Sequence, residues 1–219
     1  MKNDSVKLKD SRKLLLLSSG KFLINHPQLF NKPFKDLKMA YVITASKVVT
    51  DRAYIERERA FFRAHDYDCQ ELDLDGKNEN ELKTILKNMD LVYVTGGNGF
   101  YLLKSIRESG FDKVIKKLLP EGLIYMGASA GSYVTCPTIE MAGLRHQNKY
   151  DHYGVTDLRA MALVPFLLTV HYKPEYKNLV QEKIKNIKYP LRILNDDQAI
   201  LIENGKTTLV GEGKEIFLR

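Results

Sequence analysis

Short apolar runs alternate with longer amphipathic stretches through most of this chain, and that alternation limits the fold more than any other feature. The runs are typical of buried strands, and the stretches between them repeat apolar side chains at helical spacing. Strands that alternate with helices favour a mostly parallel sheet covered on both faces. The predicted strands cover residues 14–18, 38–44, 68–74, 91–94 and 122–126, and the predicted helices cover 53–65, 80–89, 100–109, 113–119 and 174–187.

The C-terminal part of the chain predicts strands over 191–219, with Asn204-Gly205 between two of them. An Asn-Gly pair between apolar segments is a strong short-range hairpin signal. Residues 137–164 carry a weak pattern and predict loops. We therefore expect a single α/β domain over 1–219, a three-layer sandwich whose mostly parallel central sheet carries an antiparallel C-terminal hairpin.

Composition narrows the class of protein. The chain is 44% hydrophobic and 28% charged, which suits a packed core. Its formal net charge of +7 comes from scattered residues, so we expect no nucleic-acid partner. Cys69 and Cys136 lack metal-ligand spacing, and the four-residue apolar run 14–17 is too short for a secretory or membrane segment. These features predict a cytoplasmic protein with no membrane contact and no zinc site.

A Gly-x-Ser-x-Gly turn, Gly127-Ala128-Ser129-Ala130-Gly131, follows the predicted strand 122–126 and precedes a predicted helix start. Small neighbours let the chain turn sharply there and lift a serine hydroxyl above the sheet edge. Ser129 is therefore a candidate nucleophile, and the Ala130 N–H would face the reacting carbonyl. The structural alternative is a small-residue turn that packs a helix closely on the sheet.

A nucleophilic serine needs a base, which a carboxylate usually orients. His171 follows the apolar run 165–170, so it would stand just beyond a buried strand and could reach Ser129. Its acid could precede it in the chain (Asp151 or Asp157) or follow it (Asp196 or Asp197), and spacing leaves both orders open. The other histidines are expected at the surface or in the weakly patterned region: His26, His65, His146 and His152.

A second loop, Gly96-Gly97-Asn98-Gly99, follows the predicted strand 91–94. Glycines let backbone N–H groups approach an anion, so the Gly97 N–H could complete an oxyanion hole with that of Ala130. Asn98 could bind substrate or cap the following helix. Charged residues 56–59 are expected on the solvent face of the helix 53–65. His146, Asp151 and His152 match no established metal-site spacing.

Together these motifs resemble peptidase family S51, which includes dipeptidase E and, more distantly, cyanophycinase. The resemblance covers most of the chain and is sharpest over VYVTGGNGFYLLKSIRESG and GLIYMGASAGSYVTCPTIE. It implies a class I glutamine-amidotransferase-like fold with serine in place of cysteine.

The resemblance also implies roles for single residues. It favours a Ser129-His171-Asp196 triad, Gly97 and Ala130 as oxyanion donors, and short peptides, such as dipeptides with N-terminal Asp, as substrates. The mechanism that it implies needs no metal and no cofactor, and we expect the protein to be a monomer or homodimer. The chain departs from dipeptidase E at Ala128, where that enzyme has a bulky aromatic, and in its aspartate acid. Residues 140–163 do not clearly match the segment expected to shape the substrate pocket, where Arg145, His146 or Lys149 could bind an acidic side chain.

Overall fold

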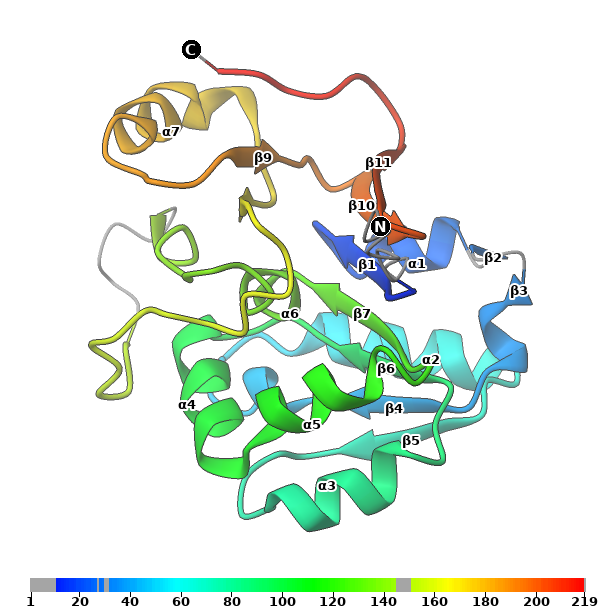
Figure 1. Ribbon diagram of the computed structural model, residues 1–219. Helices are drawn as coiled ribbons and strands as arrows, with labels where there is room; N and C mark the ends of the chain where they lie inside the picture. Colours follow the sequence, from blue (N-terminus) through cyan, green and yellow to red (C-terminus); the bar gives the residue numbers. More distant parts are fainter. Residues whose placement is uncertain (1–10, 27, 30–31, 145–150, 219) are drawn as a thin grey trace, which may run out of the picture.

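The computed structural model describes residues 11–26, 28–29, 32–144 and 151–218. Its central sheet is built from β1 (Lys13–Leu17), β4 (Met39–Val42), β5 (Cys69–Leu72), β6 (Leu91–Val94), β7 (Ile124–Ala128), β10 (Gln198–Glu203) and β11 (Lys206–Gly211). The strand order is β11-β10-β1-β7-β6-β4-β5 (Figure 1). The strands β1, β7, β6, β4 and β5 run parallel to one another. β10 pairs antiparallel with β1, and β11 pairs antiparallel with β10 at the edge of the sheet. The predicted mostly parallel sheet with an antiparallel hairpin is confirmed.

Helices cover both faces of this sheet (Figure 1). One face packs against α3 (Glu79–Leu86), α4 (Gly99–Ser109), α5 (Phe111–Leu118) and α6 (Ala130–Tyr133), and the other against α1 (Lys21–Asn25) and α2 (Ala53–Ala64). All four residues of β6 are buried because alternate side chains enter opposite cores. Val92 and Val94 join the first core, whereas Leu91 and Tyr93 join the second. Two cores divided by one sheet give the three layers.

The hairpin forms at the predicted pair. Asn204 and Gly205 have φ values of 53° and 73°, and Glu203 pairs with Lys206 across the turn. Positive φ at both central positions is the type I′ signature. The strand prediction for 212–218 was wrong, since that segment holds an isolated bridge between Ile193 and Ile216. Gly211 and Gly213, with φ values of 100° and 82°, interrupt the extended backbone there.

A second, two-stranded parallel sheet stands apart from the central one. It pairs β8 (Leu167–Thr169) with β9 (Leu191–Ile193), and the chain between them forms η4 (Pro174–Tyr176) and α7 (Lys177–Ile184). The remaining short elements are β2 (Gln28–Leu29), β3 (Lys32–Pro33), η1 (Phe34–Asp36) and η2 (Thr44–Ser46). Among the described residues, no helix combines the length and apolar character needed to cross a membrane.

Candidate active site

Ser129 stands on a sharp turn between β7 and α6, at φ 51° and ψ −107°. This is an unusual backbone conformation for a residue with a side chain, and it persists only where the surroundings enforce it. A Cβ on Gly127 would lie 2.4 Å from the Gly131 oxygen, and one on Gly131 would lie 2.0 Å from the Val94 oxygen. Both glycines of the motif are therefore required by close backbone approach, and the turn presents the Ser129 side chain at the sheet edge.

His171 lies two residues beyond β8, and its Nε2 is 2.9 Å from Ser129 Oγ. Its Nδ1 is 2.5 Å from Asp196 Oδ1. A proton on Nδ1 is needed to bind the carboxylate, and the neutral ring then presents the Nε2 lone pair to the Ser129 hydroxyl. The structure thus brings together Ser129 and His171, which the motifs predicted, and Asp196, which the family resemblance favoured.

The other candidate acids make different contacts. Asp157 binds Arg159 through its side chain, and this ion pair lowers the Asp157 pKa to about 2. Asp151 Oδ1 accepts a hydrogen bond from the Tyr153 N–H at 2.8 Å. Asp197 donates its backbone N–H to Asn195 Oδ1. The geometry favours Asp196 as the partner of the histidine.

Ser18 is a buried residue of the site that sequence reasoning missed. It follows β1, and its Oγ accepts a 2.6 Å hydrogen bond from the backbone N–H of His171. The same hydroxyl lies 3.2 Å from Asp196 Oδ1 and 3.4 Å from the Leu194 oxygen. Ser18 therefore links the histidine to the aspartate. A signal was present, because Ser18 directly follows a buried apolar strand. That signal points to the active site only once β1 is known to be the neighbour of β7.

The glycine loop after β6 lies beside Ser129. A Cβ on Gly96 would lie 3.3 Å from Ser129 Cβ and 3.8 Å from its Oγ. Gly97 has a φ of 137°, and a Cβ there would lie 2.1 Å from the Ala45 oxygen. Glycine is needed at position 97 both for its backbone angle and for close contact with η2. The loop brings backbone amide groups next to the serine.

The Asn98 side chain has structural partners. Its Oδ1 accepts hydrogen bonds from the N–H groups of Phe100 and Tyr101 at 2.9 and 3.0 Å, which caps α4. Its Nδ2 donates to the Asp151 carbonyl oxygen at 3.0 Å. The capping alternative is present in the structure, and substrate binding by Asn98 stays a prediction.

The other described histidines stack on aromatic rings. His152 lies parallel to Phe100 with ring centroids 3.9 Å apart, His26 stacks on Phe22 at 4.2 Å, and His65 lies 4.2 Å from Phe61. Among the residues that the structure describes, no group of three or more His, Cys, Asp or Glu side chains could hold a metal ion. Arg145, His146 and Lys149 lie outside the described residues.

A buried carboxyl group lies behind the glycine loop, on the face covered by α2. Glu58 is 4% exposed, so its expected place on the solvent face of the helix was wrong. Three hydroxyl groups surround it: Tyr41 and Thr95 donate to Oε2 at 2.5 and 2.8 Å, and Tyr93 donates to Oε1 at 2.8 Å. Burial raises the Glu58 pKa above its usual value, and the hydroxyl donors oppose that rise. These hydrogen bonds offset the cost of burying a polar group.

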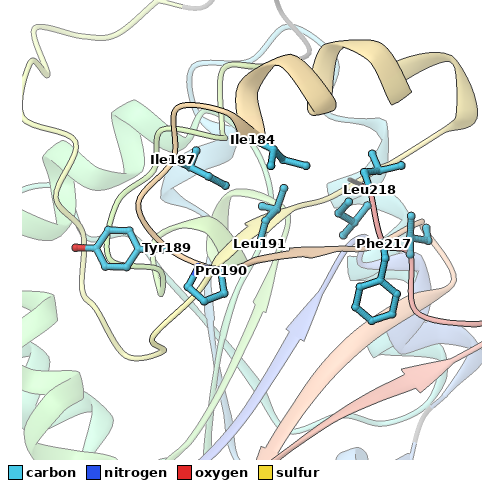
Figure 2. Close-up of a pocket in the computed structure, with 9 residues that line it drawn as sticks. Ile184, Ile187, Tyr189, Pro190, Leu191, Phe217 and Leu218 are labelled. Atoms are coloured by element: carbon cyan, nitrogen blue, oxygen red, sulfur yellow. The ribbon is translucent and has the colours of Figure 1, made fainter.

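A cavity of about 280 Å³ lies elsewhere, between α7, β9 and the C-terminal segment (Figure 2). Aliphatic and aromatic side chains surround it, among them Ile184, Leu191 and the largely exposed Phe217. The residues that line it include no Ser, Cys, His, Asp or Glu, so this cavity lacks the nucleophile and base that acyl transfer requires. The candidate chemistry lies at Ser129.

Comparisons with known proteins match the chain to a family of peptidases. The model of peptidase family S51 matches residues 14–210. The chain is similar to an uncharacterized peptidase of Listeria monocytogenes, with 29% identity over 214 residues that cover 95% of this chain and 98% of the relative. It is also similar to Peptidase E of Nostoc sp., with 31% identity over 135 residues, but that match covers 62% of this chain and 52% of the relative.

Two solved structures superpose on this chain over most of its length. A Listeria monocytogenes protein assigned provisionally to peptidase E superposes with a TM-score of 0.80 at 26% identity, over 92% of this chain and 99% of that one. A peptidase from an acI-B1 Actinobacterium superposes with a TM-score of 0.68 over 95% of this chain and 91% of that one. The second pair is 16% identical, so it bears on the fold alone.

Proposed function

The chain belongs to peptidase family S51, and from that premise we propose that it is a serine peptidase acting on short peptides through an acyl-enzyme. One observation carries the proposal: Ser129 Oγ lies 2.9 Å from His171 Nε2, while His171 Nδ1 lies 2.5 Å from Asp196. A nucleophile within hydrogen-bond reach of a base, itself oriented by a third group, is the arrangement of covalent hydrolases.

In the first half-reaction, Ser129 Oγ attacks the peptide carbonyl carbon while His171 Nε2 accepts the hydroxyl proton. The negative charge that develops on the carbonyl oxygen is stabilised by the N–H groups of Gly97 and Ala130. Protonated His171 then donates its proton to the leaving amine, and Asp196 stabilises the charged ring during this transfer. In the second half-reaction, His171 deprotonates a water molecule, which releases the acyl group and restores Ser129.

A fluorophosphonate probe tests the serine chemistry directly. We expect the probe to label Ser129 in the purified protein and the Ser129→Ala variant to remain unlabelled, with Ser132→Ala as a matched control. Ser132 is a buried serine in α6 whose hydroxyl contacts the Leu17 and Gly127 oxygens at 2.7 Å. If wild-type protein stays unlabelled while a known serine hydrolase reacts alongside, the proposal fails.

The resemblance to dipeptidase E supports dipeptides with an N-terminal Asp as the substrate class. A panel of dipeptides that differ in the N-terminal residue tests this specificity, with free amino acids measured as products. Cleavage of Asp-Xaa alone is the expected result, whereas cleavage of many dipeptides would require a broader specificity. We also propose that the protein acts in the cytoplasm, since both Cys69 and Cys136 are free thiols.

A further inference from the structure

Helix α2 holds the glycine loop through two side chains one helical turn apart. The Tyr54 hydroxyl donates a 3.0 Å hydrogen bond to the carbonyl oxygen of Gly96. Glu58, four residues along the same helix, accepts a 2.8 Å hydrogen bond from Thr95 Oγ1. Thr95 and Gly96 are consecutive residues at the carboxyl end of β6, so α2 fixes this end of the strand from behind the active-site edge.

The Gly96 carbonyl and the Gly97 N–H belong to one peptide unit. Peptide units are planar, and every described one is trans. The carbonyl and the N–H of a trans unit point in opposite directions. A hydrogen bond that fixes the direction of the Gly96 carbonyl therefore also fixes the direction of the Gly97 N–H.

Glycine has the widest range of backbone angles, and this peptide unit joins Gly96 to Gly97, so the contacts of its own atoms help to set its orientation. The neighbouring backbone is anchored on either side, by the Thr95 N–H to the Val42 oxygen at 3.1 Å and by the Asn98 N–H to the Ala45 oxygen at 2.9 Å. Those contacts hold the flanks of the loop. The Tyr54 hydroxyl binds the Gly96 carbonyl itself.

The same hydrogen bond also has an electronic effect. A donor at the carbonyl oxygen polarises the peptide and makes its N–H a stronger donor. The unit lies close to the reacting atoms, since a Cβ on Gly96 would be 3.8 Å from Ser129 Oγ. Preorganised donors of this kind act where charge develops in the transition state, so their effect falls on the chemical step.

We propose that Tyr54 is a positioning residue that aims and polarises the Gly97 N–H toward the oxyanion. The inference rests on the proposed serine-hydrolase function and goes beyond it by assigning a role to a residue of α2 that acts through the Gly96–Gly97 peptide unit. The proposed role depends on one hydrogen bond, from the Tyr54 hydroxyl to the Gly96 oxygen, and Tyr54→Phe removes that bond while leaving the ring in place.

The test is the kinetics of fluorophosphonate labelling, because the phosphoryl oxygen of the probe uses the same donors as an oxyanion. The maximal labelling rate and the probe concentration at half-maximal rate are measured for wild type, Ser129→Ala, Tyr54→Phe and Tyr67→Phe. Tyr67 is a matched control: it packs beside Phe61 and Phe62 of α2, and its buried hydroxyl has no hydrogen-bond partner among the described residues.

We expect Tyr54→Phe to lower the maximal rate about tenfold, less than the roughly 10²–10³-fold loss for a whole oxyanion donor. The half-maximal concentration and the melting temperature should not change, and Tyr67→Phe should label like wild type. Labelling of Tyr54→Phe at the wild-type rate, or an equal loss in both tyrosine variants, overturns the inference and leaves the proposed function standing. Wild-type protein that is not labelled overturns both.

Discussion

Asp196 Oδ1 lies 2.5 Å from His171 Nδ1, although neither residue belongs to the central sheet. The small β8–β9 sheet brings them together. Leu194 donates its N–H to the Thr169 oxygen, and Tyr172 donates its N–H to the Leu194 oxygen, both at 2.9 Å. The two strand ends therefore deliver histidine and aspartate side by side, while the elbow after β7 delivers the serine.

Asp196→Asn should disable the enzyme without unfolding it. The amide keeps the shape of the carboxylate, but it cannot stabilise the charged imidazole and it favours the wrong ring tautomer, an effect that can reach about 10⁴-fold in kcat. The maximal rate of fluorophosphonate labelling measures it. Asp157→Asn is the matched control, because Asp157 pairs with Arg159. Loss of labelling in Asp157→Asn with retention in Asp196→Asn would reverse the assignment of the acid.

Ser18→Ala should lower both activity and stability. The substitution leaves the His171 N–H without its acceptor, at a cost of about 1–3 kcal/mol for an unsatisfied buried group. It also removes the contact between Ser18 and Asp196, so the pair can shift, and a displacement of about 1 Å can cost up to about 10²-fold in rate. Urea unfolding and labelling kinetics measure the two effects.

Ser19→Ala is the control for that experiment. The Ser19 hydroxyl accepts an exposed hydrogen bond from the Lys21 N–H, so its loss should alter neither quantity. Ser18→Ala protein with wild-type stability and a wild-type labelling rate would show that the 2.6 Å hydrogen bond to His171 contributes to neither quantity.

The sequence predicted the central sheet because its inner strands β1, β4, β6 and β7 are buried on both faces and are mostly apolar. The hairpin could be predicted from the Asn204-Gly205 pair alone, because the positive φ values of this turn suit few other residues. The place of β8 could not be predicted. Its apolar run predicts a buried strand, but it does not indicate whether the neighbouring strand is β9 or a strand of the central sheet.

The residues of the site also fall into two groups: some are marked by the local sequence, and others only by contacts with residues distant in the chain. Ser129 follows from small residues at fixed spacing around it, and Gly97 from a glycine pair at a strand end. Ser18 and Tyr54 carry no such local mark. Ser18 contacts a residue 153 positions away, and Tyr54 one 42 positions away. Glu58 was misplaced because charged residues of amphipathic helices usually face solvent. Its three hydroxyl partners come from β4, from β6 and from the residue after β6.

Glu58→Gln should change how stability depends on pH. Burial raises the Glu58 pKa in the folded state, so the unfolded chain loses this proton first as pH rises from about 4. The stability that Glu58 contributes is present below the unfolded pKa and is lost as pH rises through the folded pKa. The free energy of unfolding of wild type relative to Glu58→Gln should therefore fall with increasing pH. Urea titrations across a pH series measure this difference.

The control is Glu56→Gln, the same chemical change on the same helix, at a side chain that is 64% exposed. The difference between wild type and Glu56→Gln should show no such fall. A difference between wild type and Glu58→Gln that stays constant or rises with pH would mean that the hydroxyl groups of Tyr41, Tyr93 and Thr95 outweigh desolvation.

Thiol reagents should leave the labelling of Ser129 unchanged. Burial raises the pKa of both Cys69 and Cys136 to about 12, so at pH 8 both remain protonated, and the thiolate is the reactive form. Ellman's reagent should react slowly with native protein and with both thiols in urea, and prior treatment with iodoacetamide should not lower the fluorophosphonate labelling rate. Cys69→Ser isolates the fully buried Cys136. Rapid loss of labelling after iodoacetamide would place a reactive thiol near the serine, which the 0% exposure of Cys136 argues against.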